Sequence, residues 1–257
     1  MKEIAVIPAR LNSKRFPNKI LYDLNGLPMI EHVRRRVMMA KKVKDVIVAT
    51  CDIEIRNVLE SYGAKVVMTS KNHRNGTTRV AEAIANISCR NVILIQGDEP
   101  LLLPRYLDKM IETIRQDNLS FAWNATGPIG SKKEIYKKSI VKASVYEDNI
   151  LYCFRERNKK MDFRIHLQRI RKILGLIAFK KDFLMKLIKM KPTLVEKFQS
   201  IEQMRIIENG YLIRSVPFDS SQPSINEPFE VGLVWEYVQN NEEQKNILED
   251  VFNFNVK

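Results

Sequence analysis

Continuous apolar runs and helix-type spacing alternate along the first half of the chain. Apolar stretches without polar alternation predict strands buried on both faces, at residues 3–9, 45–50, 64–69 and 91–96. Apolar residues spaced three and four apart predict helices at residues 28–42, at residues 77–87 and from about Pro104. Another helix is predicted after the second strand, and it ends at about Tyr62. The alternation predicts an α/β fold with a mostly parallel sheet and helices on both faces.

The pattern changes after Asn118. Further strands are predicted at residues 120–126, 140–146, 150–155, 173–179 and 211–216, with helices at 181–190, 197–208 and from about Pro228. The tripeptide EDN between two of these strands has the composition of a hairpin turn, which predicts an inserted antiparallel β region. No Gly-, Pro- or Ser-rich linker separates the halves, so we predict one domain over residues 1–257 with halves 1–118 and 119–257.

Composition excludes several classes of protein. The 257 residues are 45% hydrophobic and 28% charged, which is unlike a disordered chain. No apolar run approaches the roughly 18 residues of a membrane span, and the N-terminus lacks the features of a signal peptide. We therefore expect a cytoplasmic protein without a membrane partner. The three cysteines lie far apart, which predicts reduced thiols rather than a zinc site or disulfides.

Positive charge is in excess, because 43 Lys and Arg residues against 30 Asp and Glu residues give a formal net charge of +13. This balance is compatible with nucleic acid, a membrane surface or a small anionic substrate, and it does not choose among them. Much of it lies at residues 155–172 and 180–191, where it can also be a solvated face. Aromatic residues are sparse in the first of these segments, which disfavours single-stranded nucleic acid as a partner.

A basic loop follows the first predicted strand. The stretch IPARLNSKRFPNK contains four cations, Arg10, Lys14, Arg15 and Lys19. Cations this close repel one another unless an anion lies between them, and ligands of parallel sheets bind beyond the carboxyl ends of the strands. The pattern therefore predicts a phosphate-binding loop. It lacks the glycines of the common phosphate motifs, so it must use side-chain charge and Ser13 as well as backbone N–H groups.

The fourth predicted strand ends in the sequence QGDEP at the same edge of the sheet. A carboxylate at this position suits a hard divalent cation that holds phosphates. We predict Asp98 as the metal ligand, the alternative being a role in capping the turn. Glu99 is a weaker candidate, because adjacent side chains point apart.

The stretch HRNGTTR, residues 73–79, also falls at this edge. Asn75 and Gly76 have the composition of a turn, and Thr77 or Thr78 is predicted to cap the next helix. The N–H groups at such a helix start can receive a base edge or a phosphate, with Arg74 beside them. Taken alone, the stretch is also an ordinary helix start.

Together these stretches resemble a known family. The ordered set IPARLNSKRFPNKIL, NGLPMIEHV, VIVATCD, NHRNGTTRVAEA, ILIQGDEPLL and PTLVEKFQSIEQMR is similar to the cytidylyltransferases that make CMP-3-deoxy-manno-octulosonate, CMP-Kdo. The resemblance implies a Rossmann-like nucleotidyltransferase fold and a homodimer formed partly through the inserted strands. It also implies CTP and an acid sugar as substrates, Mg²⁺ as the cofactor, a CTP-binding first half, and a second half for sugar binding and dimerisation.

The resemblance also implies roles for individual residues. In such an enzyme the anomeric hydroxyl of a 2-keto-3-deoxy acid sugar attacks the α-phosphate of CTP, and pyrophosphate leaves. The implied catalytic residues are Arg10, Lys19 and Asp98. The implied nucleotide-binding residues are Ala9, Leu11, Ser13, Lys14, Arg15, Arg74, Asn75, Gly76, Thr77, Gln96 and Gly97. The implied sugar-binding residues are Arg155, Glu202 and Gln203, and the implied metal ligands are Asp98 and Asn226.

The chain departs from the family in its second half. The family motif GVDTPED carries a second magnesium-binding aspartate, and SINEPFE places Asn226 there. An amide oxygen attracts a hard cation less than a carboxylate does. Three consequences are open: the protein binds the metal more weakly, Glu227 or Asp219 takes the place of the missing aspartate, or catalysis is impaired. The family strand HLGIYGY becomes ILGLIAF, with Ile173 and Ile177 at positions that contact the sugar, which predicts a different sugar pocket.

The sequence is compatible with alternative functions. The acceptor could be Kdo, an amino-substituted Kdo or a nonulosonic acid. From a different class, the chain could be a catalytically weakened nucleotide- or anion-binding homologue, as the changes at Asn226, Ile173 and Ile177 allow. Nucleic-acid binding through residues 155–172 is the third alternative. Glu202 and Arg205 could also form only an i, i+3 surface pair on a helix.

Overall fold

The computed structural model describes residues 3–13, 15–155 and 169–254. The chain forms two compact units, which are described separately. The first unit comprises Met1–Ile111 together with Gln222–Lys257, and the second comprises Glu112–Ser221. The C-terminal segment therefore belongs to the same unit as the first strands.

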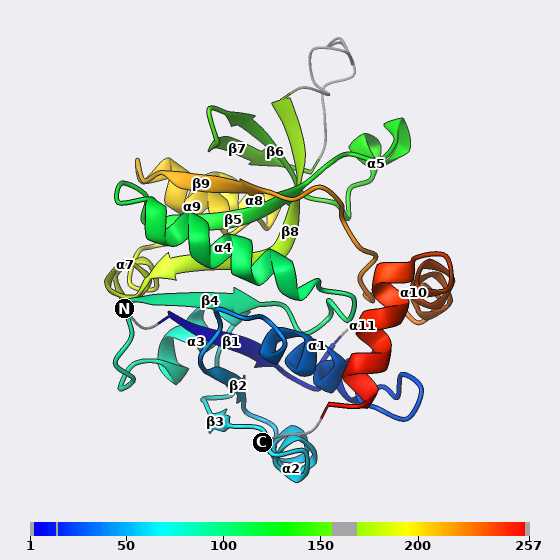
Figure 1. Ribbon diagram of the computed structural model, residues 1–257. Coiled ribbons are helices and arrows are strands. Elements are labelled where there is room, and N and C mark those ends of the chain that lie inside the picture. Colours follow the sequence, from blue (N-terminus) through cyan, green and yellow to red (C-terminus); the bar gives the residue numbers. More distant parts are fainter. Residues whose placement is uncertain (1–2, 14, 156–168, 255–257) are drawn as a thin grey trace. The chain divides into compact units, whose positions relative to one another are not determined.

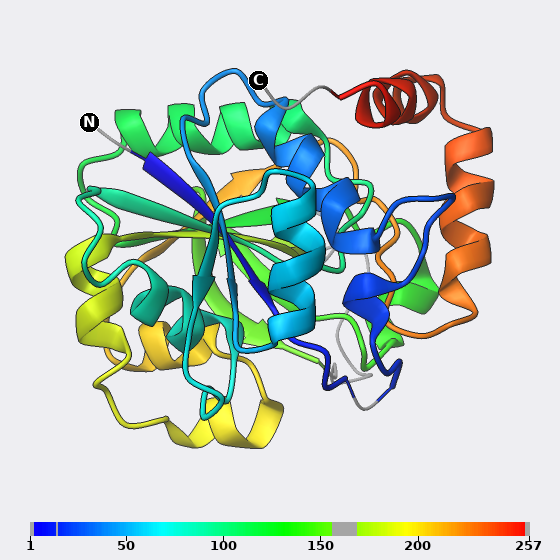
Figure 2. The same cartoon turned by 90° about the horizontal axis from the view of Figure 1, so that it is seen from below.

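A parallel sheet forms the centre of the first unit. Its strands, in spatial order, are β3 (Val66–Met68), β2 (Val46–Thr50), β1 (Glu3–Ala9) and β4 (Asn91–Ile95). Every residue of β1 and β4 is buried, as expected for strands covered on both faces. Helix α1 (Met29–Met38) lies on one face and α3 (Gly76–Ala83) on the other, and α2 (Ile53–Ser61) follows β2 (Figures 1 and 2). The predicted parallel α/β arrangement is confirmed for this unit.

Helix α1 carries buried charge. Arg34, Arg35 and Arg36 are at most 9% exposed, although they interrupt the apolar spacing of the helix. Glu31, fully buried, accepts hydrogen bonds from Arg34 Nε at 2.6 Å and from Arg35 Nε at 2.8 Å. The arginines are therefore part of the interior of the unit, where charged groups need partners.

The C-terminal helices supply further partners to α1. Helices α10 (Glu230–Gln239) and α11 (Glu242–Phe252) replace the single final helix that was predicted from Pro228. The break occurs where the Asn241 side chain accepts a hydrogen bond from Gln244 N and so caps α11. Arg35 donates to Val251 O at 2.8 Å, and Arg36 donates to Gln244 Oε1 at 2.9 Å.

The strands of the second unit close on themselves. They are β5 (Ala122–Gly127), β6 (Lys142–Tyr146), β7 (Asn149–Phe154), β8 (Ile170–Lys180) and β9 (Ile213–Pro217). Their order is β8-β5-β9-β7-β6, and β6 pairs again with β8. Only β5 and β9 are parallel among the pairs described. The predicted hairpin is present between β6 and β7, with Glu147 and Asp148 at positive φ in its turn.

Five helices complete the description. Helix α4 (Pro104–Gln116) crosses the sequence boundary of the two units, and the second unit also contains α5 (Lys132–Tyr136), α7 (Lys181–Leu187), α8 (Leu194–Gln199) and α9 (Gln203–Glu208). The prediction of one helix at residues 197–208 is wrong. Ser200 adopts a left-handed conformation, with φ 54°, and ends α8. A capping box of Thr193 and Glu196 starts that helix earlier than predicted.

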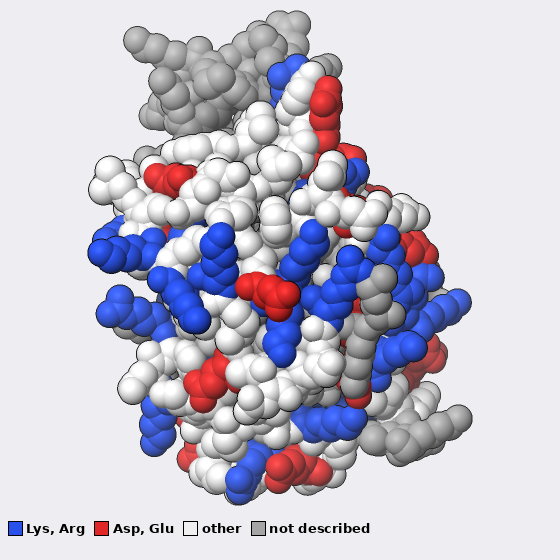
Figure 3. All heavy atoms as spheres, turned by 90° about the vertical axis from the view of Figure 1, so that its left-hand side faces the viewer, with Lys and Arg blue, Asp and Glu red and all other residues white. Residues whose placement is uncertain are grey.

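The structure also bears on membrane spans, cysteine reactivity and surface charge. In the described ranges, no helix is long and apolar enough to cross a membrane. Burial raises the pKa of the Cys153 thiol to about 12, so this cysteine stays protonated and unreactive. Lys and Arg side chains outnumber acidic ones on the face shown in Figure 3, in keeping with the net charge of +13. Most of the basic segment 155–172 lies outside the described residues.

Candidate functional site

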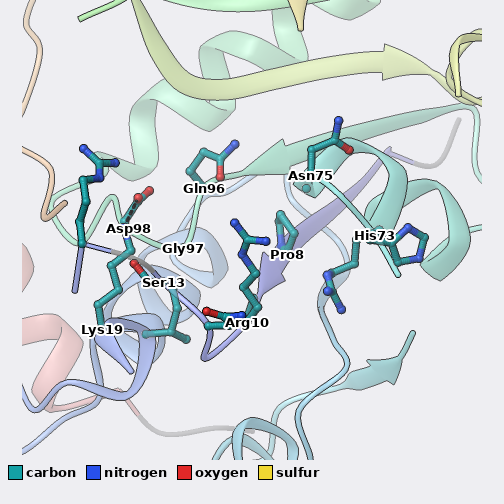
Figure 4. A pocket seen from close by; sticks show the side chains of 15 residues that line it. Pro8, Arg10, Ser13, Lys19, His73, Asn75, Gln96, Gly97 and Asp98 are labelled. Carbon is teal, nitrogen blue, oxygen red and sulfur yellow. Dashed lines mark hydrogen bonds and ion pairs between the residues drawn. The ribbon is translucent and has the colours of Figure 1, made fainter. Parts of the chain in front are cut away.

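A pocket of about 420 Å³ lies in the first unit, at the carboxyl ends of β1 and β4. The predicted residues that line it are Ala9, Arg10, Ser13, Arg15, Lys19, Asn75, Gly76, Gln96, Gly97 and Asp98. Figure 4 shows Lys19 beside Asp98 at one end of the pocket, Arg10 in the middle and His73 at the other end. The structure therefore brings the three predicted stretches together around one cavity.

The basic loop, residues 10–19, is held at both ends. Leu11 N donates to Asp52 Oδ2 at 2.8 Å, so this predicted ligand-binding amide is already engaged with a side chain at the end of β2. Asn18 N donates to Leu11 O at 3.1 Å and closes the loop. Asn18 adopts φ 56°, a conformation that asparagine tolerates better than most residues. Phe16 and Ile20 are buried beneath the loop, which keeps its cations at the pocket.

Lys19 links the basic loop to the QGDEP turn and to the C-terminal segment. It belongs to a short 3₁₀ helix, η1 (Lys19–Leu21). Its Nζ donates to Asp98 Oδ2 at 2.6 Å and to Ile225 O at 3.2 Å. Ile225 N donates in turn to Asp98 O at 3.1 Å. The side chains of Lys19 and Asp98 are only 11% and 24% exposed, so the pair is partly shielded from water.

Asn226 lies next to this contact, in the segment that leads to α10. Its Oδ1 accepts a hydrogen bond from Arg15 Nη2 at 3.1 Å, and its Nδ2 donates to Ser224 Oγ at 3.1 Å. The backbone N–H groups of Asn226 and Glu227 donate to Glu230 Oε2 at 2.6 and 3.0 Å. Glu230 therefore fixes the turn that presents Asn226 toward Arg15.

Asn75 caps α3, which corrects the prediction that Thr77 or Thr78 does so. Asn75 Oδ1 accepts from Thr78 N at 3.0 Å, because Asn75 directly precedes Gly76, the first helical residue, whereas Thr77 and Thr78 lie inside the helix. Gly76 is required for packing, since a Cβ there would lie 2.9 Å from Pro8 Cγ. A Cβ on Gly97 would lie 3.0 Å from Ile20 Cδ1. Both glycines thus allow close contact with the structure around β1 and the basic loop.

Some predicted residues do not line the pocket. Leu11 and Thr77 are absent from its described lining, Arg74 is exposed outside it, and Lys14 lies outside the described residues. The pocket gains residues that sequence reasoning missed: Pro8, Asn12, Ile20, His73 and Arg79. The signal for Pro8 and Asn12 was available, because both belong to the quoted IPARLN stretch.

His73 and Arg79 are both fixed by neighbours. His73 Nε2 is hydrogen-bonded to Glu82 Oε2, and this bond holds the pKa of Glu82 below its usual value. Arg79 Nη1 donates to Thr69 Oγ1 at 2.7 Å, and its Nη2 donates to Cys51 Sγ at 3.4 Å. Helical periodicity placed Arg79 in a helix. It could not show that the side chain contacts Cys51 after β2 and Thr69 after β3.

The donor set can be tested against a magnesium ion. No group of three or more His, Cys, Asp and Glu side chains suited to a metal occurs among the described residues. The pocket offers the Asp98 carboxylate, and Asn226 Oδ1 lies beside Arg15, another lining residue. Magnesium in nucleotide enzymes is commonly held by one or two carboxylates, substrate phosphates and water. The residues therefore fit a metal that binds with a phosphate ligand and do not form a dedicated protein cage.

The residues predicted for the sugar lie in the second unit. Gln203 Nε2 donates to Asn124 Oδ1 at 2.9 Å, and Asn124 is fully buried. Arg155 donates to Gln199 O at 2.8 Å and to Ser200 O at 3.2 Å, at the junction of α8 and α9. Glu202 directly precedes α9. The structure thus places Arg155 against the turn that leads to Glu202 and Gln203.

Ile173 and Ile177 of β8 lie in the strand that pairs with β5, which carries Asn124. Ile177 is opposite Asn124, and Ile173 is opposite Thr126. Arg205 pairs with Glu196 rather than forming an isolated surface pair with Glu202, since its Nε donates to Glu196 Oε2 at 2.7 Å. Asp219 belongs to the second unit, whereas Asp98 and Asn226 belong to the first.

Comparisons with known proteins show the family of the chain. A sequence model described as Cytidylyltransferase matches residues 4–215. The 3-deoxy-manno-octulosonate cytidylyltransferase of Geotalea uraniireducens (strain Rf4) is 34% identical over 247 residues, which cover 92% of this chain and 98% of that protein. The 8-amino-3,8-dideoxy-manno-octulosonate cytidylyltransferase of Shewanella pealeana (strain ATCC 700345 / ANG-SQ1) is 33% identical over 243 residues, which cover 91% and 97% of the two chains.

A solved structure shows the same fold. The structure of a CMP:2-keto-3-deoxy-manno-octonic acid synthetase complexed with CTP superposes with a TM-score of 0.87 and 29% sequence identity. The superposition covers 93% of this chain and 99% of that chain. The protein is therefore a cytidylyltransferase, a nucleotidyltransferase of the family that contains the 3-deoxy-manno-octulosonate cytidylyltransferases.

Proposed function

We propose that the protein transfers CMP from CTP to the anomeric hydroxyl of a 2-keto-3-deoxy acid sugar and releases pyrophosphate. The observation that carries this proposal is the pocket at the ends of β1 and β4, where Arg10, Arg15 and Lys19 surround a space next to Asp98. A triphosphate matches this surplus of positive charge. Nucleotidyl transfer also needs positioning and charge neutralisation more than a protein nucleophile.

The residues of the pocket have distinct tasks in this proposal. The Arg10 side chain makes no hydrogen bond or ion pair with another described residue, and so it is available for the triphosphate. Lys19 neutralises charge on the leaving pyrophosphate, while Ser13, Lys14 and Arg15 assist. Asp98 and Asn226 hold Mg²⁺, which supplies electrostatic stabilisation of the phosphate oxygens when bound. Arg155, Glu202 and Gln203 bind the acid sugar, whose own hydroxyl is the nucleophile.

The acceptor is proposed to be Kdo or a modified Kdo. The relatives from Geotalea and Shewanella, whose names give Kdo and 8-amino-Kdo respectively, are 34% and 33% identical to this chain. Ile173 and Ile177 offer no hydrogen bonds, which favours an acceptor that differs from Kdo where it meets β8. The activated sugar would serve surface polysaccharide synthesis. We also propose a homodimer, a CTP-binding half at 1–118, a sugar-binding half at 119–257 and a cytoplasmic location.

Release of pyrophosphate from CTP tests this function. The full-length protein is assayed with Mg²⁺ and a panel of Kdo, 8-amino-Kdo and a nonulosonic acid, and each CMP-sugar product is identified by mass. We expect one Kdo-type sugar to be used at least about tenfold better than the others, measured as kcat/KM. UTP in place of CTP and omission of the sugar serve as controls. If CTP binds but no sugar releases pyrophosphate, the proposed reaction is wrong.

A further inference from the structure

Both proposed metal donors are occupied by cations of the basic loop. Lys19 Nζ lies 2.6 Å from Asp98 Oδ2, and Arg15 Nη2 lies 3.1 Å from Asn226 Oδ1. Asp98 is the only acidic residue that lines the pocket within the described chain, against four lining cations, Arg10, Arg15, Lys19 and Arg79. The ligand oxygens and the phosphate-binding side chains are therefore paired with each other.

A divalent cation would compete with these contacts. It would have to approach Asp98 Oδ2 against a lysine ammonium already within hydrogen-bond distance, and partial burial of this pair strengthens the repulsion. It would also meet the Arg15 guanidinium at Asn226, where a neutral amide offers only weak attraction in return. Free Mg²⁺ is thus disfavoured at the positions where the reaction needs it.

A triphosphate changes this balance. Its oxygens are strong hydrogen-bond acceptors for lysine and arginine. They compete with Asp98 Oδ2 for Lys19 and with Asn226 Oδ1 for Arg15. When Lys19 and Arg15 turn to the phosphates, Asp98 Oδ2 and Asn226 Oδ1 lose these partners and become free. The backbone bond between Ile225 N and Asp98 O, together with Glu230 at Asn226 N, holds both donors in place during this exchange.

We propose that Lys19 and Arg15, besides binding the phosphates, mask the metal donors until a triphosphate binds. The inference rests on the proposed function, because it assumes that Asp98 and Asn226 are the metal ligands. The masking couples the two ligands: nucleotide raises the affinity for the metal, and the metal raises the affinity for nucleotide by the same factor. Metal binding is then confined to protein that already holds its substrate.

Binding of Mn²⁺ to the nucleotide-free, full-length protein tests the masking directly. Electron paramagnetic resonance of free Mn²⁺ measures the dissociation constant for the wild type, Lys19→Met and Arg15→Met. We expect a decrease of about tenfold in this constant for Lys19→Met and a smaller decrease for Arg15→Met, because each removes a unit charge beside a donor. Lys65→Met is the matched control, since Lys65 forms an exposed ion pair with Asp45 and does not line the pocket. Equal Mn²⁺ affinity in all four proteins overturns the proposal.

Asn226→Asp gives a second discriminating comparison. The new carboxylate is expected to pair with Arg15, so this change alone should alter Mn²⁺ affinity little. Combined with Arg15→Met, it should increase the affinity by more than the two single changes together. If Asn226→Asp alone gives the full increase, Arg15 does not mask this position and that half of the proposal fails.

A metal-free measurement keeps the test independent of the metal. In EDTA, CTP binding is followed by calorimetry in the wild type and in Asp98→Asn, which releases Lys19 from its ion pair. We expect CTP to bind several-fold more tightly to the variant, and unchanged or weaker binding contradicts the masking. If the binding tests fail but pyrophosphate is still released, only the masking is refuted. If the binding tests succeed but no sugar is used, only the proposed reaction is refuted.

Discussion

At the scale of single residues, the first unit buries ionisable groups that sequence spacing alone would place at the surface. His32 is 2% exposed, and its Nε2 is hydrogen-bonded to Leu24 O at 2.8 Å. Burial lowers the pKa of His32 from 6.5 to about 4, with a smaller contribution from the positive charge of Arg36. The imidazole therefore stays neutral in the folded protein at pH values where it would be protonated in the unfolded chain.

This burial predicts a loss of stability in mild acid. A group whose pKa is lower in the folded state stabilises it above the unfolded pKa, and the contribution is lost as pH falls from 6.5 toward 4. Between pH 7 and pH 5 the free energy of unfolding should fall by about 2 kcal/mol through His32. Urea unfolding of the wild type and of His32→Gln at both pH values measures this. The variant should lack that part of the decrease, and identical pH dependence in the two proteins would contradict the assignment.

At the scale of elements, α8 and α9 are joined by an ion pair. Glu196 belongs to the capping box of α8, and it accepts hydrogen bonds from Arg205 Nε and Nη2, in a pair whose side chains are 9% and 11% exposed. The bond to Glu196 raises the pKa of Arg205. This contact fixes the angle between the two helices at the break near Ser200, and so it orients Gln203 toward Asn124.

Removing one partner of this pair should be costly. Glu196→Ala leaves a half-buried guanidinium without its carboxylate, and the expected loss in the free energy of unfolding is about 2 kcal/mol, between the values for exposed and buried pairs. Glu242→Ala is the matched control, because Glu242 forms an exposed pair with Lys245, and its loss should be about 0.5 kcal/mol. Denaturant unfolding followed by circular dichroism gives both values. Similar values for the two variants would mean that the α8–α9 pair contributes no more than a surface contact.

Sequence patterns predicted elements better than contacts between them. The apolar runs at β1, β2 and β4 were sufficient, because strands covered on both faces leave a continuous signal. The break at Ser200 was missed, since a serine in a left-handed conformation has no reliable sequence signal. The partner of Asn226 was also missed, because Arg15 and Asn226 lie 211 residues apart in the chain. No local pattern reports such a contact.

At the scale of the whole molecule, net charge is the dominant electrostatic property. A formal charge of +13 favours the approach of an anionic nucleotide, and salt screens this attraction. The net charge follows from the composition alone. The basic loop at the end of β1, with Arg10 and Lys19, was also predicted from the sequence, whereas the presence of Arg79 from α3 at the pocket required the fold.

Salt should therefore weaken nucleotide binding. The KM for CTP is expected to rise several-fold between about 50 and about 500 mM KCl, as the screening length falls from roughly 14 to 4 Å. The kcat should change less, because the bound triphosphate is partly shielded from solvent. Initial rates at constant free Mg²⁺ measure both quantities, with sucrose of equal osmolality as the control for water activity. A KM that is independent of salt would contradict long-range attraction by the pocket.

The discontinuity of the first unit also has a consequence for biosynthesis. On the ribosome, the strands up to Ile111 emerge first, and their C-terminal partners follow only after the whole of Glu112–Ser221 has been made. At about 5 to 20 residues per second, this delay lasts roughly 5 to 20 s. During that interval Arg35 and Arg36 lack Val251 and Gln244, and Lys19 lacks Ile225. A nascent or truncated chain therefore contains every described lining residue of the pocket but lacks the Ile225 carbonyl that holds Lys19 beside it.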